Sequence, residues 1–215
     1  MIKINSYTVG VVQTNCYLVV DTETNTGLII DPGGKSSKLE EDLQNLDSVE
    51  YILLTHGHFD HTLKTAEYQA LTNAKIVMGA NEKEFAHNQD LNLYRKGIDV
   101  FTPDILANDG DFLKFGSTQI KIISTPGHTK GSVCYIINSN IFSGDTLFNR
   151  GVGRTDFITG DNIALKASLK KLYSLEEDYT VYPGHGYLTT LFSEKNNNTG
   201  LAKESSIKGF KITNN

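Results

Sequence analysis

Four potential metal ligands stand within six consecutive residues of this chain, directly after an apolar run. The run, residues 49–54, is rich in residues typical of strands and predicts a buried strand. The segment THGHFDH follows it at residues 55–61, and its potential ligands are His56, His58, Asp60 and His61. Imidazole and carboxylate groups bind divalent transition metals, and four such side chains at this density rarely serve packing. The segment therefore predicts a metal site at the end of a buried strand.

The spacing within this segment separates the ligands into two sets. His56 and His58 lie two positions apart, so in extended backbone they project to the same side, and Gly57 lets the chain bend between them. Asp60 and His61 follow after a turn and can address a second position nearby. One short segment can therefore contribute to two adjacent metal positions.

Three further potential ligands share one pattern, because each follows a strand-like run and lies beside glycine. They are His128 in PGHT, Asp145 in SGDT and His185 in PGHG. In layered α/β domains, the loops at one edge of the sheets converge on the functional site. Seven ligands are too many for one tetrahedral metal and suit two metals bridged by a carboxylate and a hydroxide. The pattern therefore predicts a two-metal centre.

Alternating strands and helices organise the chain into two loosely similar halves. Short apolar runs predict strands at residues 2–9, 16–20, 27–30, 49–54, 75–78, 112–115, 119–123, 132–137 and 179–182. Helices are expected from residue 37, over 62–72, near 82–88 and around 165–172, the last with Asp161 or Asn162 as its N-cap. A surface excursion within residues 81–109 could overhang the site. We expect one catalytic domain over residues 1–192 and a polar tail over 193–215.

Composition and charge exclude several classes of protein. The 215 residues carry a net charge of −5, from 20 Lys and Arg against 25 Asp and Glu, which argues against a nucleic-acid binder. No apolar run approaches the length of a membrane span, and the first 15 residues do not resemble a signal peptide. Cys16 and Cys134 lie in apolar runs and are expected to be buried free thiols, which suits a reducing, cytoplasmic location. These features leave the oligomeric state open.

The motifs HGHFDH, PGHT, GDT and PGHG, in this order, resemble the metallo-β-lactamase superfamily over roughly residues 2–190. The resemblance implies an α/β fold in which two β-sheets lie between helices, as a four-layer αββα sandwich. It also implies the ligand sets: His56, His58 and His128 for a first metal ion, Asp60, His61 and His185 for a second, and Asp145 as the bridge. Two divalent ions are implied, with zinc expected and iron or manganese as alternatives. Asp31, in an Asp-Pro-Gly turn, would orient the ligands from behind.

Within the superfamily, three further motifs resemble the glyoxalase II group, or hydroxyacylglutathione hydrolases. These motifs are TNCYL at residues 14–18, GDTLF at 144–148 and GVGRTDF at 151–157. The resemblance implies hydrolysis of a small-molecule thioester, S-2-hydroxyacyl-glutathione or a related acyl thiol, by a metal-bridging hydroxide. Asp60 and Asp145 would be the catalytic carboxylates. The true lactamases carry a cysteine where Asp145 stands, so an antibiotic is not the expected substrate.

The chain departs from the glyoxalase II group in two places. Where that group holds glutathione with a Lys and a Tyr, this chain has Arg154 and Asp156, which could contact the substrate or form a structural salt bridge. Only 30 residues follow His185, and they lack the apolar periodicity of the helical domain that glyoxalase II adds there. The carrier thiol is therefore left open.

Other functions fit the same motifs. A non-haem iron persulfide dioxygenase is the nearest, because that group also resembles this chain in its GRTDF stretch, and one iron could bind His56, His128 and Asp145. A lactonase could use the same metal pair. The acidic balance argues against a nuclease, and a binding module without catalysis is expected to have lost ligands. We therefore expect a small-molecule substrate, with neither nucleic acid nor membrane as a partner.

Overall fold

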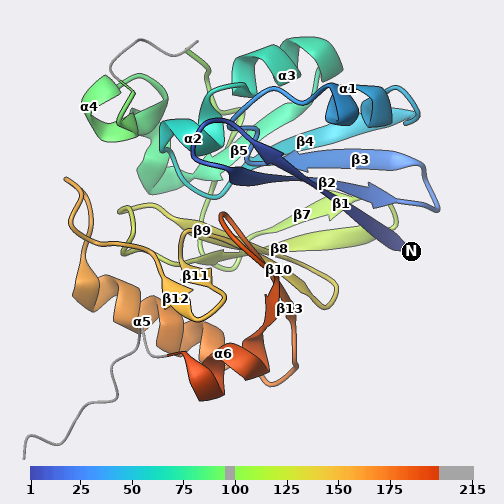
Figure 1. Ribbon diagram of the computed structural model, residues 1–215. Coiled ribbons are helices and arrows are strands. Elements are labelled where there is room, and N and C mark those ends of the chain that lie inside the picture. Colours follow the sequence, from blue (N-terminus) through green and yellow to red (C-terminus); the bar gives the residue numbers. More distant parts are fainter. Residues whose placement is uncertain (95–99, 199–215) are drawn as a thin grey trace, which may run out of the picture.

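Two six-stranded β-sheets lie face to face between two layers of helices in the computed structural model, which describes residues 1–94 and 100–198 (Figure 1). The first sheet contains, in spatial order, β1 (Ile2–Val9), β2 (Thr14–Asp21), β3 (Thr26–Ile30), β4 (Ser48–Leu54), β5 (Lys75–Gly79) and β6 (Ile105–Ala107). The second contains β14 (Thr189–Thr190), β13 (Thr180–Pro183), β10 (Asn140–Gly144), β9 (Val133–Ile137), β8 (Thr118–Ser124) and β7 (Phe112–Phe115). This architecture confirms the predicted αββα sandwich.

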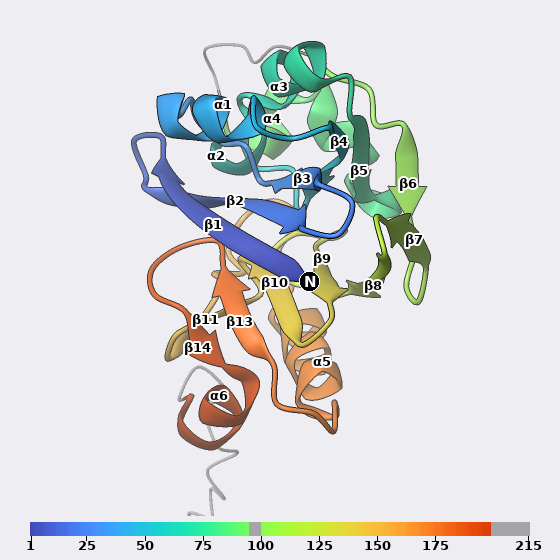
Figure 2. The same cartoon turned by 90° about the vertical axis from the view of Figure 1, so that its right-hand side faces the viewer.

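The helices are divided between the two outer faces (Figures 1 and 2). The first sheet is covered by α1 (Ser37–Leu43), α2 (Phe59–Thr62), α3 (Thr65–Thr72), the 3₁₀ helix η1 (Ala80–Ala86) and α4 (Gln89–Asn92). The second sheet is covered by α5 (Asn162–Tyr173) and α6 (Leu191–Asn197). A small hairpin of β11 (Leu147–Phe148) and β12 (Gly151–Val152) follows β10. None of the helices among the described residues is long and apolar enough to cross a membrane.

Alternating side chains divide the core into three buried layers. Leu18 in β2 packs with Leu39 of α1 under the first helical layer. Its neighbour Tyr17 points the other way, into the space between the two sheets. The third layer lies between the second sheet and α5, where Leu169 is buried. Because successive strand residues face opposite sides, β2 is buried on both faces and reads as a continuous apolar run.

The ends of parallel strands place the functional loops at one edge of the sandwich. β3 and β4 run parallel in the first sheet, and β10 and β13 run parallel in the second. The carboxyl ends of parallel strands meet at the same sheet edge, so the loops that follow these four strands emerge together.

The structure differs from the predicted elements in several places. The predicted helix over 62–72 consists of two pieces, α2 and α3, because the chain leaves helical geometry at Lys64, whose φ is −110°. The predicted helix near 82–88 is the 3₁₀ helix η1. The short strands β6, β11, β12 and β14 were not predicted, since two or three residues carry too little pattern. Asp161 is the N-cap of α5, as predicted, and accepts hydrogen bonds from two backbone N–H groups of its first turn.

The chain remains ordered into its last helix. Leu191 is buried, and the carboxylate of Glu194 accepts hydrogen bonds from Arg150 N and Thr189 Oγ1. The predicted boundary at residue 192 therefore falls inside α6. Residues 199–215 of the predicted tail and residues 95–99 of the predicted excursion lie outside the described residues. Cys16 and Cys134 are buried free thiols, as expected.

Asp21 ties the two sheets together at the end of the sandwich opposite those loops. Its buried carboxylate accepts hydrogen bonds from Glu23 N and from Ser117 N, in the turn between β7 and β8. A Cβ atom at Gly116, where φ is +50°, would lie 2.3 Å from Asp21 Oδ2. These hydrogen bonds, that from Ser117 N first, hold the pKa of Asp21 well below its usual range.

We predict that Asp21→Asn lowers the free energy of unfolding by about 1–3 kcal/mol at pH 7, because one buried N–H loses its acceptor. The ionised form of Asp21 stabilises the fold above the unfolded-state pKa of about 4, and this contribution is lost as the pH falls through the folded-state pKa. Urea unfolding at pH 7 and pH 3 measures the difference. Asp47→Asn, at an exposed position, is the control. An equal loss of unfolding free energy in both variants would contradict the prediction.

Candidate metal centre

The structure brings all seven predicted ligands together at one edge of the sandwich. His56 and His58 follow β4, while Asp60 and His61 lie on the short helix α2. His128 lies in the loop between β8 and β9. Asp145 and His185 follow β10 and β13. Three groups among them have ligand atoms within 4.8 Å of one another and could each hold a metal ion: His56, His58 and His128; His56, His61 and Asp145; and Asp60, His61 and His185.

The first group consists of three buried imidazoles whose ring nitrogens converge. His58 Nδ1 lies 3.1 Å from His56 Nε2 and 3.0 Å from His128 Nε2. Burial and the neighbouring rings lower the pKa of His56 well below its usual value and that of His58 to about 3; burial also lowers the pKa of His128. The three rings are therefore neutral at physiological pH, which is the form in which histidine binds a metal.

The second group combines imidazoles with carboxylates. Asp60 Oδ2 lies 3.2 Å from His185 Nε2 and 3.5 Å from His61 Nε2. Asp145 stands between the two groups, with Oδ1 at 3.4 Å from His61 Nε2 and Oδ2 at 3.6 Å from His128 Nε2. Asp145 therefore lies within reach of both groups of histidines.

Hydrogen bonds on the outer side of the rings orient the nitrogens that face inward. His61 Nδ1 lies 2.8 Å from Asp31 Oδ2, which can only accept, so this nitrogen carries a proton, and in the neutral ring Nε2 keeps its lone pair. Thr55 Oγ1 donates to the same oxygen at 2.7 Å, and His56 Nδ1 can then donate to Thr55 Oγ1 at 3.2 Å. His56 Nε2 is left unprotonated toward the centre. Asp31 therefore orients ligands from behind, as expected.

Two of these outer partners were not predicted from the sequence. The carbonyl oxygen of Arg154 accepts a hydrogen bond from His128 Nδ1 at 2.8 Å, which leaves Nε2 facing inward. A backbone acceptor leaves no trace in residue identity. Thr55 directly precedes His56 in the first motif, so its position alone was the available signal.

Unpaired buried atoms indicate that the cluster is built for cations. His61 Nε2 and Asp145 Oδ1 are buried and have no hydrogen-bond partner. Burial lowers the pKa of His61, but the carboxylates of Asp60, Asp31 and Asp145 outweigh it and raise the pKa well above the usual value. The site thus attracts positive charge where the donors converge. Nitrogen and oxygen donors of this kind fit zinc, iron or manganese.

A glycine beside the last ligand permits this convergence. A Cβ atom at Gly184 would lie 2.3 Å from Asp145 Oδ1 and 2.7 Å from the His61 ring. Any side chain at this position would therefore displace two ligands. The glycine in the PGHG motif is explained by this close approach.

A pocket of about 300 Å³ opens onto the cluster. Besides the ligands, its walls are the apolar side chains of Val12, Phe59, Leu93 and Phe157, with Arg154 at the rim. A cavity of about 250 Å³ adjoins it and shares Val12, Phe59 and Asp60. Together they offer an apolar approach to a polar, metal-binding floor, as in most small-molecule sites.

Arg154 and Asp156 form the salt bridge that was one of two expectations for them. Two guanidinium nitrogens donate to the two carboxylate oxygens at 2.8 and 2.7 Å, and both side chains are 65% exposed. The guanidinium also lies 4.5 Å from the centroid of the Phe157 ring. Because this pair borders the pocket, the salt bridge and a substrate contact are compatible.

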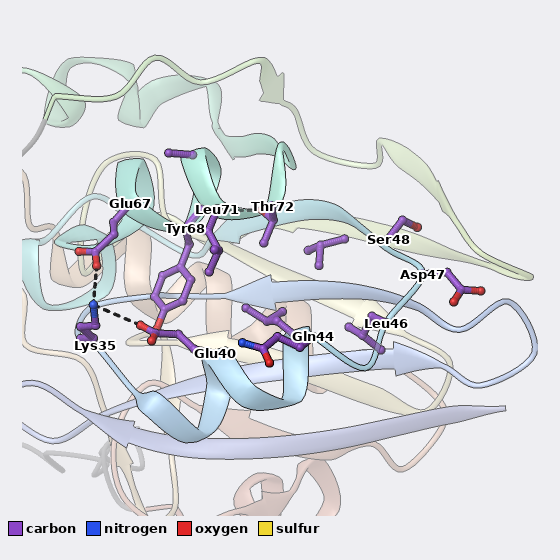
Figure 3. A pocket seen from close by; sticks show the side chains of 13 residues that line it. Lys35, Glu40, Gln44, Leu46, Asp47, Ser48, Glu67, Tyr68, Leu71 and Thr72 are labelled. Atoms are coloured by element: carbon purple, nitrogen blue, oxygen red, sulfur yellow. Dashed lines mark hydrogen bonds and ion pairs between the residues drawn. The ribbon is translucent and has the colours of Figure 1, made fainter.

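A larger cavity of about 620 Å³ lies away from the cluster, between α1 and α3 (Figure 3). Lys35 Nζ pairs there with Glu67 at 3.0 Å and with Glu40 at 3.5 Å. None of the histidines described above lines it. The smaller pocket at the cluster, rather than this groove, has the chemistry of an active site.

Comparison with known proteins agrees with the geometry. The profile of the metallo-beta-lactamase superfamily matches residues 9–185. The hydroxyacylglutathione hydrolase GloC of Haemophilus influenzae is 37% identical over 203 residues, covering 90% of this chain and 95% of the relative. A probable polyketide biosynthesis zinc-dependent hydrolase, BaeB of Bacillus velezensis, is 31% identical. The match covers 80% of this chain and 72% of that relative.

Solved structures share the fold. The crystal structure of BLEG-1 B3 metallo-beta-lactamase superposes with a TM-score of 0.87 at 31% identity, covering 93% of this chain and all of that one. The structure of TTHA1623 in a di-iron-bound form has a TM-score of 0.77 at 33% identity, covering 90% of this chain and 98% of that one. The structure of ETHE1 from Myxococcus xanthus has a TM-score of 0.74 at 29% identity, covering 91% of this chain and 83% of that one.

We predict that Asp31→Asn weakens metal binding by roughly 10- to 100-fold, because an amide has one acceptor oxygen: it cannot receive the bonds of Thr55 Oγ1 and His61 Nδ1 at one position and the bond of Thr55 N at the other. Competition with a chromophoric zinc chelator measures the affinity. The exposed Asp104→Asn removes a carboxylate that also accepts a backbone hydrogen bond, from Ile76 N, and is expected to bind zinc like the wild type. Zinc affinity equal to that of the wild type in Asp31→Asn would contradict the role of Asp31 in orienting the histidines.

Proposed function

The chain belongs to the metallo-β-lactamase superfamily, and from this premise we propose that it is a two-metal hydrolase of a small-molecule thioester. The proposed substrate is an S-2-hydroxyacyl-glutathione or a related acyl thiol. The 37% identical hydroxyacylglutathione hydrolase supports this choice, and the chain matches that relative over nearly its full length.

One observation carries the proposal: the described residues that line the pocket include no spare proton donor at its floor. Among the residues that line it, the titratable side chains are the guanidinium of Arg154 at the rim and five of the proposed ligands: His58, Asp60, His128, Asp145 and His185. A leaving group that needs a strong general acid would find none. A thiolate leaves without one, since a simple thiol has a pKa near 8.5.

We propose the following ligand roles for the chain. His56, His58 and His128 would hold the first metal ion, Asp60, His61 and His185 the second, and Asp145 would lie between them. Bound there, two divalent ions supply a hydroxide at neutral pH and polarise the substrate carbonyl. Zinc is the proposed metal; the zinc-dependent relative supports it, and the di-iron neighbour supports iron as an alternative.

Residues around the ligands would position the reaction. Thr14 Oγ1 donates a hydrogen bond to Asp60 Oδ2 at 3.2 Å and so holds this carboxylate in place. Asp60 would orient the attacking water toward the carbonyl carbon. The apolar walls, formed in part by Val12 and Phe157, would exclude other water from the scissile bond.

We predict that purified protein hydrolyses S-lactoylglutathione without oxygen, and that metal removal abolishes this activity. Asp145→Ala is expected to lower kcat/KM at least 100-fold, because it removes the carboxylate between the two ligand groups. The exposed Lys166→Ala is the control. Wild-type turnover in Asp145→Ala, or in metal-stripped protein, would overturn the proposal.

Arg154 is proposed to grip a carboxylate of the carrier thiol, while Asp156 holds the guanidinium over Phe157. We predict that Arg154→Ala raises KM for S-lactoylglutathione about tenfold with little change in kcat, as for the loss of one charge-assisted hydrogen bond of about 1.5 kcal/mol. The matched control is the lactoyl thioester of N-acetylcysteamine, which has no carboxylate and should not respond. An equal rise for both thioesters would contradict the proposed contact.

A second candidate is an iron-dependent persulfide dioxygenase, because the GRTDF stretch at residues 153–157 also resembles that group. In this alternative, His56, His128 and Asp145 would hold one iron. Oxygen consumption with glutathione persulfide, without anaerobic thioester hydrolysis, would favour it. A lactone and a β-lactam should be included in the same panel, since a neighbour of 31% identity is a B3 metallo-beta-lactamase.

A further inference from the structure

We propose that Glu82 is a positioning residue for the three-histidine metal site: its carboxylate joins the loop of His56 and His58 to the loop of His128. This inference rests on the ligand roles proposed above. Glu82 belongs to η1 and faces neither substrate nor metal. It would act through the backbone of the two ligand-bearing loops.

Each carboxylate oxygen of Glu82 receives a hydrogen bond from a different loop. Oε2 accepts from Gly57 N at 2.8 Å, and Gly57 lies between the two histidines of the first loop. Oε1 accepts from Gly131 N at 2.8 Å, three residues after His128. The side chain has no exposed surface. A buried carboxylate thus forms a two-point bridge between segments that are 74 residues apart in the sequence.

The two glycines allow η1 to pack directly on both loops. A Cβ atom at Gly57 would lie 2.2 Å from Phe85 Cβ, and one at Gly131 would lie 2.6 Å from Glu82 N. The backbone around both hydrogen bonds is therefore held closely. The bridge sets the distance between the loops on the η1 side.

A second bond joins the same loops on the sheet side. Val133 N donates to Thr55 O at 2.9 Å. Between the two bridges, His58 Nδ1 and His128 Nε2 lie 3.0 Å apart. With one bridge lost, the loops could separate at the η1 edge, and a separation of about 1 Å is enough to impair a preorganised site.

Burial raises the pKa of Glu82 to about 7, while hydrogen bonds from Thr129, Gly131 and Gly57 favour its ionised form.

The test is Glu82→Gln, which keeps the size of the side chain but has one acceptor oxygen and turns an NH₂ group toward a backbone donor. We expect zinc affinity at the three-histidine site to fall roughly 10- to 100-fold, as for other residues that support metal ligands. Visible absorption of the cobalt(II)-substituted protein should change in band position or intensity, because cobalt reports the geometry of its ligands. An unchanged cobalt spectrum with unchanged zinc affinity would overturn the inference.

Thermal unfolding separates positioning from plain structural support. Zinc stabilises the fold in proportion to its affinity, so a positioning role predicts a smaller zinc-induced rise in Tm for Glu82→Gln than for wild type. A residue that only supports the fold would lower Tm equally with and without zinc. That result would also overturn the inference.

Glu84→Gln is the matched control. Glu84 lies on the same 3₁₀ helix and reaches the same His128 loop, but it does so through an exposed ion pair with Lys130 at 2.7 Å. We expect this variant to match wild type in zinc affinity and cobalt spectrum, because exposed pairs contribute little. If Glu82→Gln does not fold, Glu82→Asp keeps the charge, is one methylene shorter and should show the same changes; wild-type behaviour of that variant would count against the bridge.

These measurements need no substrate. If wild-type protein binds zinc but hydrolyses no thioester, the proposed function fails while the role of Glu82 stands. If Glu82→Gln binds zinc and cobalt like wild type while Asp145→Ala is inactive, the role of Glu82 fails while the hydrolase proposal stands.

Discussion

The structure depends on the mutual approach of electron-rich donors that would repel one another without positive charge between them. Three neutral imidazoles direct ring nitrogens at a common point about 3 Å apart, and two carboxylates stand beside the next pair of rings. Such a grouping is unfavourable unless protons or cations occupy it, since buried charge needs compensation. Binding of metal ions is therefore coupled to the stability of this edge of the sandwich.

The fold holds the donors from outside, through contacts that do not involve the centre. Asp31 links His61 directly and His56 through the hydroxyl of Thr55, so one carboxylate orients ligands of both groups. Tyr135 in the second sheet donates to Leu54 O in the first, directly before the ligand segment. The rigidity of the site thus arises from hydrogen bonds between the sheets, and the ligands themselves need contribute little to it.

The sequence predicted which histidines and aspartates would lie together, because their chemistry is carried by residue identity. His128, Asp145 and His185 were assigned together from short motifs at strand ends, and the structure places them within one cluster. The sandwich was implied by the resemblance of the motifs to the superfamily, and β2, β3 and β9, which read as continuous apolar runs, agree with it. The break between α2 and α3 was not predicted, since no proline or glycine marks it.

What the sequence did not reveal are contacts made by backbone atoms or by residues distant along the chain. The carbonyl of Arg154 and the amides of Gly57 and Gly131 act through atoms that every residue possesses. Glu82 lies in a polar segment for which a short helix was predicted, yet its side chain is fully buried. Only tertiary packing gives such a residue its environment, so local pattern cannot identify it.

The order of the ligands along the chain has a consequence for biosynthesis. His56 emerges from the ribosome about 130 residues before His185, and β13, which carries His185 to the centre, pairs in parallel with β10 and accepts a hydrogen bond from Asn15 N through Gly184 O. The amino-terminal sheet can form its own hydrogen bonds early, but it exposes the face that the second sheet covers until translation is nearly finished. During that interval the nascent chain presents an incomplete set of histidines to the metals of the cell. The complete set of donors therefore belongs to the closed sandwich, and not to the histidine-rich segment that is synthesised first.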